Sequence, residues 1–286
     1  IMASSSMKLG TLSKADREFY NTNGYCLKND FLDREIIDKI RNEAKELFAI
    51  QIRNNGIELN SLGDKDFEPA LYELFRTDFN SFIGGAKLCQ HTFSMHQLAV
   101  SEGLMDNLQH IGLEHPVVCV KPLMFFNSPH ISKIEGHYKT PAHQDWRSMQ
   151  GSLNSIVIWI PLIDVDRDLG TLEIVPGSHL RGLFDSVEDD WFRNIPESEI
   201  PESEYVSVDV KKGDVLFFSS FLVHRSGNNT SQNVRWSMHF RYNDANERNF
   251  IDRKFPHPYK VYHPEKDLVT PNFPTKQDLK EAYGNN

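Results

Sequence analysis

Two histidines and one carboxylate are the strongest candidates for chemistry in this sequence. His143 and Asp145 stand two residues apart in the stretch TPAHQDWRSM, and His224 closes the hydrophobic run DVLFFSSFLVH. A His-x-Asp pair alone is weak evidence, because the chain contains 12 histidines and 40 acidic residues and a solvated polar turn is the ordinary interpretation. Two neutral imidazoles and one carboxylate form the facial triad of non-haem Fe(II) oxygenases, which leaves the opposite face of the metal open.

An arginine strengthens this interpretation. Arg235 follows His224 within the predicted strand NVRWSMHF, where Val234 and Trp236 flank it. A buried guanidinium is costly without a partner, and arginine binds a carboxylate through two parallel hydrogen bonds. Arg235 is therefore expected to bind the far carboxylate of a dicarboxylic co-substrate that chelates the metal, and Ser226 is positioned to donate its hydroxyl to the same group.

The first part of the chain, residues 12–115, is expected to be mainly helical. Ser13 and Asp16 resemble a capping box and Gly24 a helix stop. Asp33 is the expected cap of a second helix, whose apolar stripe has the period of one helical face. The members of this stripe are Ile36, Ile37, Ile40, Ala44, Leu47 and Phe48. Weaker helical patterns follow at about 68–82 and 96–112.

From about residue 117 to 245 the pattern changes to short β-branched and aromatic runs bounded by Gly, Pro, Asn or Asp. The predicted strands are 117–127, 154–165, 171–179, 205–210, 214–224 and 234–244. The stretch VSVDVKKGDVLFF predicts a hairpin. Many short strands without intervening helices favour a jelly-roll core, a double-stranded β-helix as in cupins. The expected fold class is therefore mainly β with N-terminal helices (α+β).

Two long segments, 128–141 and 181–205, interrupt the predicted strands. Structureless segments of this length in a compact domain are often lids or binding loops. The second segment is acidic.

Length and composition set the remaining expectations. The 286 residues suit a single domain, 7–286, with an irregular tail at 246–286, and residues 1–6 (IMASSS) are expected to be a remnant of recombinant expression before a natural start at Met7. The net charge of −9 argues against nucleic-acid binding, and no apolar run approaches the roughly 18 residues of a membrane helix. Three scattered cysteines and no secretion signal favour the cytoplasm. Oligomeric state cannot be read from the sequence.

Beyond these features, the chain resembles the phytanoyl-CoA dioxygenase family of Fe(II)/2-oxoglutarate oxygenases. The resemblance spans roughly residues 12 to 245. Its motifs are DREFYNTNGYCLKNDFLDREIIDKI near the N-terminus, HQDW at 143–146, VIWIPLIDVDRDLGTLEIVPGSH at 157–179 and HRSGNNTSQNVRWSMHFRY at 224–242.

The resemblance implies the cofactors and the roles of single residues. The chain would use Fe(II), 2-oxoglutarate and O₂ to hydroxylate an unactivated C–H bond, releasing succinate and CO₂. The implied iron ligands are His143, Asp145 and His224, and the implied co-substrate residues are Arg235, Ser226, Trp159 and Met124. Gln144 and Trp146 adjoin the ligands and are expected to floor the substrate pocket. Related halogenases carry a small residue at the position of Asp145, so hydroxylation is expected here rather than halogenation.

Other functions stay open at this point. Desaturation or cyclisation would use the same centre. A non-catalytic jelly-roll module with a vestigial site, or a metal-dependent isomerase or hydrolase, would not need a fixed cation such as Arg235. The substrate is expected to be a small metabolite, rather than phytanoyl-CoA, because the 181–205 loop is acidic and no peroxisomal address ends the chain.

Overall fold

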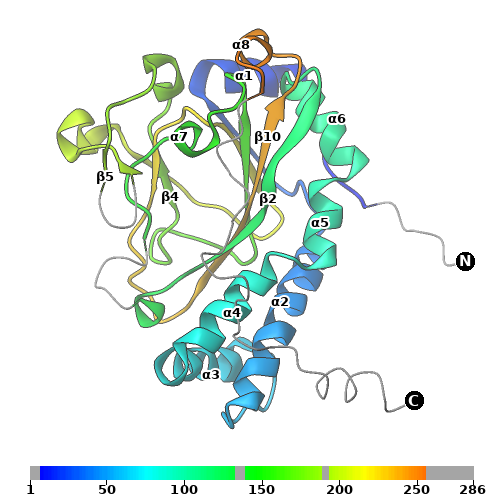
Figure 1. The fold of residues 1–286 in the computed structure, drawn as a ribbon, viewed down its shortest axis with the longest axis vertical. Helices are drawn as coiled ribbons and strands as arrows, with labels where there is room; N and C mark the ends of the chain where they lie inside the picture. The colour runs from blue at the N-terminus through cyan, green and yellow to red at the C-terminus, as the bar shows by residue number, and fades with distance from the viewer. Residues whose placement is uncertain (1–6, 133–138, 189–192, 256–286) are drawn as a thin grey trace, which may run out of the picture.

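An antiparallel sheet of five strands is the centre of the molecule (Figure 1), and its strand order is β1-β8-β3-β10-β2. This computed structural model describes residues 7–132, 139–188 and 193–255. The strands of the sheet are β1 (Tyr25–Lys28), β2 (Pro116–Asn127), β3 (Ile156–Pro161), β8 (Val215–Ser219) and β10 (Arg235–Asp244).

A second sheet of three strands packs against one face of the first. Its order is β7-β4-β9, and its strands are β7 (Val206–Val208), β4 (Leu172–Ile174) and β9 (His224–Ser226). Successive side chains of a strand point to opposite faces, so alternate residues of each sheet meet in the space between them. Val157, Trp159 and Phe218 of the large sheet form one apolar cluster there with Leu172 and Ile174 of the small sheet.

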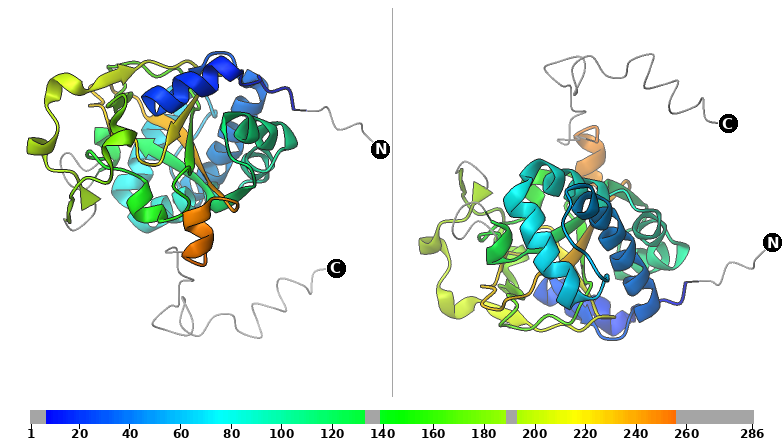
Figure 2. Two further views of the ribbon diagram at one scale, coloured as in Figure 1. Left: turned by 90° about the horizontal axis from the view of Figure 1, so that it is seen from above. Right: turned by 90° about the horizontal axis from the view of Figure 1, so that it is seen from below.

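Helices cover the other face of the large sheet. The alternate residues Ile158, Phe217 and Trp236 pack into a second apolar cluster with Ile37 and Phe48 of the N-terminal helices. Figures 1 and 2 show these helices on one side of the sheet and β5 on the far side. The helices are α1 (Lys14–Asn23), α2 (Arg34–Asn54), α3 (Asp64–Thr77), α4 (Phe79–Cys89), α5 (Phe93–Ala99), α6 (Glu102–Ile111), α7 (Trp146–Met149) and α8 (Arg248–Asp252).

Short elements complete the connections. The part of the chain that the structure describes has four 3₁₀ turns, at Pro129–Ile131, Ser178–Arg181, Glu197–Glu199 and Glu202–Glu204, and β5 (Val187–Glu188) pairs with β6 (Arg193–Asn194). The last two 3₁₀ turns and the β5–β6 pair belong to the acidic 181–205 segment. No helix in the described ranges is both long enough and apolar enough to cross a bilayer.

The strongest local signals of the sequence are confirmed. Ser13 and Asp16 form a capping box at the start of α1, and Gly24 ends this helix in the left-handed conformation. Asp33 caps α2 by accepting a hydrogen bond from the Glu35 backbone. The two weaker patterns each correspond to two helices, because Asp78 caps α4 and Ser101 caps α6 where one continuous helix was predicted.

Two expectations about the strands are wrong. Helices occupy more of the described chain than strands do, so the fold is a mixture of helices and antiparallel sheet and not mainly β. The predicted hairpin does not form, since β7 pairs in the small sheet and β8 in the large one. The Asp214 carboxylate accepts hydrogen bonds from the backbone amides of Lys211 and Asp30. The bond from Asp30 links the residue before β8 to the segment after β1, and β8 pairs with β1 rather than with β7.

Smaller differences concern element boundaries. Strand β1 lies within the part expected to be helical, and His224 begins β9 rather than ending the strand before it. Helix α8 occupies the start of the tail that was expected to be irregular. The rest of that tail, 256–286, and residues 1–6 lie outside the described residues.

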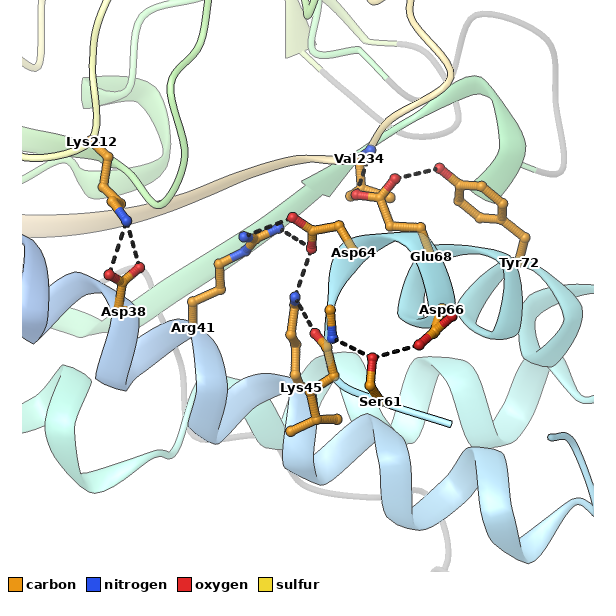
Figure 3. A network of polar contacts seen from close by, with 12 residues as sticks. Asp38, Arg41, Lys45, Ser61, Asp64, Asp66, Glu68, Tyr72, Lys212 and Val234 are labelled. Atoms are coloured by element: carbon orange, nitrogen blue, oxygen red, sulfur yellow. Dashed lines mark hydrogen bonds and ion pairs between the residues drawn. The ribbon is translucent and has the colours of Figure 1, made fainter. Parts of the chain in front are cut away.

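A polar network joins the helical layer to the start of β10 (Figure 3). In α2, Arg41 and the buried Lys45 both bind the Asp64 carboxylate at the start of α3. One turn later in α3, Glu68 accepts a hydrogen bond from the Val234 backbone at 3.3 Å. Val234 immediately precedes Arg235, so this network fixes where β10 begins.

Candidate active site

The three residues proposed as metal ligands lie together between the two sheets. One donor atom from each of His143, Asp145 and His224 falls within 4.8 Å of the others. The Asp145 carboxylate oxygens lie 3.6 Å from His143 Nε2 and 3.8 Å from His224 Nε2. Asp145 and His224 are buried and His143 is partly buried. Within the described part of the chain, these are the residues that could hold a metal ion.

Backbone pairing brings these side chains together. His143 and His224 form an antiparallel bridge in which each amide donates to the carbonyl of the other residue, at 3.0 and 3.2 Å. Beyond Asp145 the chain turns into α7, and the Trp146 amide donates to the Ser220 carbonyl. The His-x-Asp spacing thus places one histidine on a strand-like bridge and its carboxylate partner at the following turn.

Each histidine presents Nε2 toward the carboxylate. His143 Nδ1 donates to the Pro141 carbonyl at 2.8 Å, and His224 Nδ1 donates to the Leu222 carbonyl at 2.9 Å. A carbonyl oxygen only accepts, so Nδ1 carries the proton and Nε2 keeps its lone pair. Burial and the neighbouring His143 lower the pKa of His224 to about 4. His224 is therefore neutral at physiological pH, as a metal-ligating imidazole must be.

Asp145 is held by an arginine that the sequence interpretation missed. Arg241 Nη2 donates to Asp145 Oδ1 at 2.9 Å. Burial alone would raise the pKa of Asp145, but the guanidinium of Arg241 and the two histidines keep that pKa well below its usual value. The other oxygen, Oδ2, is buried and accepts no hydrogen bond from the described residues.

This donor set fits a divalent metal ion. Two imidazole nitrogens and one ionised carboxylate converge, and a buried carboxylate oxygen without a hydrogen bond is rare in folded proteins. Nδ1 of both histidines is already bonded to the backbone, which is how metal-binding histidines are oriented. A metal bound between Nε2 and Oδ2 would satisfy the remaining oxygen of Asp145.

Arg235 is a buried cation without a carboxylate partner among the described residues. Its guanidinium donates to the Gly170 carbonyl and, at 3.1 Å, to Ser226 Oγ, while Nε has no hydrogen-bond acceptor there. Burial lowers the pKa of Arg235 to about 10, so it stays charged at physiological pH. Ser226 lies two residues beyond His224 on β9, on the same buried face. The structure thus brings Arg235 and Ser226 together beside the triad.

The other two residues proposed for co-substrate binding, Trp159 and Met124, lie on opposite faces of the large sheet. Trp159 belongs to the apolar cluster between the sheets, and its indole Nε1 is buried without a hydrogen-bond partner in the described chain. Met124 lies opposite Met238 on β10 and belongs to the cluster that packs against the helices. The expectation that Met124 lines the co-substrate pocket is not supported, because it lies on the wrong face of the sheet.

The two residues proposed as a substrate floor have other contacts. The Gln144 side chain is buried and bonds to the backbone of Gly182, Phe184 and Phe221, so it joins three loops. The Trp146 ring stacks on Phe221, with ring centroids 5.1 Å apart, and lies beneath the Arg253 guanidinium. These contacts give Gln144 a role in loop support, and substrate binding by Gln144 and Trp146 stays a prediction.

The inner face of β10 contains more of the site than the sequence interpretation identified. Arg235, Ser237, His239 and Arg241 alternate along this strand and point between the sheets. The signal was present, because the spacing of two arginines by six residues places both on one face of a strand. No sequence motif distinguishes His239 from the other histidines, so its place on this face becomes visible only in the structure.

A cavity of about 790 Å³ lies on the outer side of the small sheet, and none of His143, Asp145 and His224 lines it. It is bordered by Thr140 and Ala142 of the segment before His143, and by Ile195 and Ile200 of the acidic 181–205 segment. The Ile195 amide donates to the Ala142 carbonyl at 2.8 Å, so this segment packs directly on the strand that holds His143. The described parts of both long segments therefore contact the segment that holds His143.

Comparisons with known proteins agree with this geometry. The family model described as phytanoyl-CoA dioxygenase (PhyH) matches residues 20–237. A 1-deoxypentalenic acid 11-beta-hydroxylase of Streptomyces exfoliatus is 26% identical over 272 residues, covering 89% of this chain and 91% of the relative. Peroxisomal phytanoyl-CoA dioxygenase of Bos taurus is 24% identical over 249 residues, covering 82% of this chain and 69% of the relative.

A solved structure supports the fold independently. It is the epimerase SnoN in complex with Fe³⁺, alpha ketoglutarate and nogalamycin RO, with a TM-score of 0.56 and 20% sequence identity. The match covers 88% of this chain and 93% of that one. At this identity the likeness concerns the fold, so the roles of single residues have to be argued from the site itself.

Proposed function

The chain belongs to the phytanoyl-CoA dioxygenase family, and from this premise we propose that it is an Fe(II)/2-oxoglutarate-dependent dioxygenase that hydroxylates a small-molecule metabolite. The reacting group is an unactivated C–H bond, O₂ is the oxidant, and succinate and CO₂ are released. The observation that carries this proposal is the buried triad whose histidines both present a free Nε2 to the ionised Asp145.

The triad residues are proposed as the iron ligands. His143 and His224 would bind through Nε2 and Asp145 through Oδ2, while Arg241 keeps Oδ1 in place. Bound iron supplies the redox chemistry by which one oxygen atom of O₂ enters succinate and the other enters the product. The chain contributes fixed ligand orientations and an enclosure from which water is largely excluded.

Arg235 is proposed to bind the distal carboxylate of 2-oxoglutarate. Its fork of donors stays charged, and the Ser226 hydroxyl lies within hydrogen-bonding distance of the same guanidinium. Trp159 faces the same space and is proposed to border the co-substrate. The rival functions, a non-catalytic module and a metal-dependent isomerase or hydrolase, give no reason for a buried arginine that has no carboxylate partner among the described residues.

We further propose that the two sheets are the halves of a double-stranded β-helix within one oxygenase domain, 7–286. Support comes from the antiparallel pairing within both sheets and from the apolar cluster between them. In this arrangement the triad lies at the contact between the halves, where β9 of the small sheet meets the segment of His143.

For the substrate, a small apolar metabolite is proposed. The hydroxylase of Streptomyces exfoliatus, whose name refers to 1-deoxypentalenic acid, aligns with 89% of this chain. Phe125 on β2 is 36% exposed on the face that points between the sheets, and its ring packs on His239. Exposed aromatic surface beside a buried polar centre suits an apolar substrate that presents a C–H bond to the metal.

The test measures succinate release by the full chain with Fe(II), 2-oxoglutarate and O₂ in the presence of candidate metabolites. Substrate-stimulated succinate is expected, together with a product heavier by one oxygen atom. Loss of two hydrogens instead would indicate desaturation or cyclisation. In Arg235→Met, 2-oxoglutarate binding should fall by roughly 10-fold or more while metal binding persists, because a charge-assisted contact is removed. An unaltered protein that neither binds 2-oxoglutarate nor forms succinate would refute the proposal.

A further inference from the structure

His239 lies on the inner face of β10, between the two arginines of the site. It pairs across the sheet with Trp159 of β3, which belongs to the apolar cluster between the sheets. Its neighbours along the strand, Met238 and Phe240, point the other way into the cluster against the helices. The strand period of two therefore directs the imidazole toward the space that contains the triad.

The surroundings of His239 are aromatic on two sides. Its ring centroid lies 4.5 Å from that of Phe125, and the Trp159 ring lies 6.4 Å away and nearly perpendicular. Burial, followed by the charge of Arg241, lowers the pKa of His239 well below its usual value, so the ring is neutral. The side chain nevertheless keeps some accessible surface.

Buried polar atoms without hydrogen-bond partners gather around this position. In the described part of the chain they include Nδ1 of His239, Oγ of Ser237, Nε1 of Trp159 and Nε of Arg235. Such atoms are rare in folded proteins, and a cluster of them indicates a polar ligand or ordered water. Trp159 lies on β3 and the other three residues lie on β10, so all four belong to the face of the large sheet that points toward the small sheet.

His239 lies along β10 between Arg241, which contacts the proposed metal site, and Arg235, which is proposed to bind the co-substrate. Two residues further along β10, Arg241 binds the proposed metal ligand Asp145, and four residues back, Arg235 binds Ser226. The electrostatic neighbours of His239 include Asp145, Arg235 and His224. A ligand that extends from the triad to Arg235 would therefore lie along the inner face of β10, which carries the His239 ring.

We propose that His239 is a further 2-oxoglutarate-binding residue, whose ring N–H donates a hydrogen bond to the 2-oxo acid end of the co-substrate, beside the metal. This inference depends on the proposed function. It divides the recognition of one small molecule between two residues of one strand, with Arg235 at the distal carboxylate and His239 at the chelating end. A neutral imidazole suits this end, because it offers a donor without adding positive charge next to the metal.

The experiment measures dissociation constants with the full chain loaded with Co(II), a substitute for Fe(II) that does not turn over. The ligands are 2-oxoglutarate and 2-oxopentanoate, which has the same 2-oxo acid end and no distal carboxylate. The variants are His239→Leu, His239→Gln, Arg235→Met and, as a control on the opposite face of β10, Met238→Leu. Circular dichroism and thermal denaturation establish that each variant folds.

For His239→Leu we expect the dissociation constants of both ligands to rise by the same factor, roughly 10-fold or more, as for loss of a hydrogen bond to a charged group. The Co(II) affinity should stay within about twofold of the unaltered chain. His239→Gln, which retains an N–H donor, should recover part of the loss. Arg235→Met should weaken only 2-oxoglutarate, and Met238→Leu should weaken neither ligand.

Three results would overturn the inference. They are unchanged ligand binding in His239→Leu, a loss confined to 2-oxoglutarate, and a parallel loss of Co(II) affinity, which would mean a structural role at the metal site. If the unaltered chain itself binds no 2-oxoglutarate, the proposed function has failed rather than this assignment alone. If His239→Leu does not fold, the comparison of His239→Gln with the unaltered chain decides: an equal, smaller rise in the dissociation constants of both ligands with unchanged Co(II) affinity supports the inference, and unchanged ligand binding or a parallel loss of Co(II) affinity contradicts it.

Discussion

At the scale of single residues, Arg241 holds the Asp145 carboxylate of the triad in place. Its guanidinium occupies Oδ1 of Asp145 at 2.9 Å and leaves Oδ2 for a metal. Without this contact the carboxylate could rotate, and a buried negative charge would lose its main counter-charge. Arg241 is therefore a positioning residue, which acts through Asp145.

The corresponding prediction is that Arg241→Leu lowers metal affinity by about 10- to 100-fold, the usual effect of removing a hydrogen-bond partner of a metal ligand. Arg241→Lys keeps the charge and should restore part of the affinity. Titration with Co(II), followed by its visible absorption, measures both. Arg235→Met is the matched control, because it also removes a buried arginine from β10, and it should bind Co(II) normally. Equal losses in Arg241→Leu and Arg235→Met would contradict the assigned role.

At the scale of elements, the turn before β4 is built around Gly170. This residue has φ of +77°, and a Cβ atom would lie 2.8 Å from both the Asn229 amide nitrogen and the Gly227 carbonyl oxygen. Its own carbonyl accepts a hydrogen bond from Arg235. The turn thus needs glycine both for its conformation and for its close approach to the segment after β9.

We therefore expect Gly170→Ala to lower the free energy of unfolding by about 1–3 kcal/mol and to weaken 2-oxoglutarate binding, since the Arg235 contact shifts with the turn. Gly84→Ala is the control. Gly84 is in α4, and a Cβ there meets nothing within 4 Å. It should leave binding unchanged and raise stability by roughly 0.5–1 kcal/mol, since alanine favours helices. Urea denaturation and calorimetric titration provide both readouts, and a Gly170→Ala protein as stable as the unaltered chain would argue against the turn's role.

The N-terminus of α1 gives a prediction about pH. Burial alone would raise the pKa of Asp16, but hydrogen bonds from Ser13 and the ion pair with Lys28 lower it to about 2. A carboxyl group with a depressed pKa stabilises the fold above its unfolded-state pKa, and this contribution is lost as the pH falls through the folded-state pKa.

Asp16→Asn should therefore destabilise the protein by about 1–2 kcal/mol at pH 7, and this difference should shrink between pH 4 and pH 2. Chemical denaturation at several pH values measures it. Glu18→Gln in the same helix is the control, because Glu18 makes only an exposed ion pair with Lys14 and should change stability little at any pH. A difference for Asp16→Asn that does not vary with pH would contradict the assignment.

The elements also show what the sequence could and could not predict. The caps of α1 and α2 were predictable, because a cap depends on a few adjacent residues. The separation of β7 from β8 was not, because the turn at 211–213 is held by Asp214 and its distant partner Asp30. In the site, His143, Asp145 and His224 were predictable from residue type and order. Met124 was misplaced, because a shift of one residue along a strand reverses the face that a side chain occupies.

At the scale of the whole molecule, the site lies between two sheets, so its ligands should stabilise the entire fold. A ligand that binds only the folded chain adds about 2.7 kcal/mol at a concentration 100 times its dissociation constant. For a chain of this size, 1 kcal/mol raises Tm by roughly 2–4 °C. Co(II) alone should raise Tm, and 2-oxoglutarate should raise it further only when Co(II) is present.

Two variants distinguish the increase in Tm caused by Co(II) from the further increase caused by 2-oxoglutarate. Arg235→Met should keep the Co(II) increment and lose that of 2-oxoglutarate, whereas Asp145→Ala should lose both. Differential scanning calorimetry measures them under identical ligand concentrations. A 2-oxoglutarate increment that persists without metal would show that the co-substrate does not chelate at this centre.

The strand order of the large sheet also has a consequence for how the protein is made. Strand β10 lies between β3 and β2, although the ribosome synthesises it long after both. Strand β1 likewise pairs with β8, which is synthesised much later. The hydrogen bond between Asn29 and Asp214 beside these strands spans 185 positions of the sequence. Pairing at such separations is slow, and until β10 arrives the apolar β3 is an open edge prone to association. A nascent chain thus acquires all three proposed metal ligands before the strand that carries Arg235, His239 and Arg241. Protection of that unfinished edge, by chaperones or by low temperature, should therefore govern the yield of folded protein.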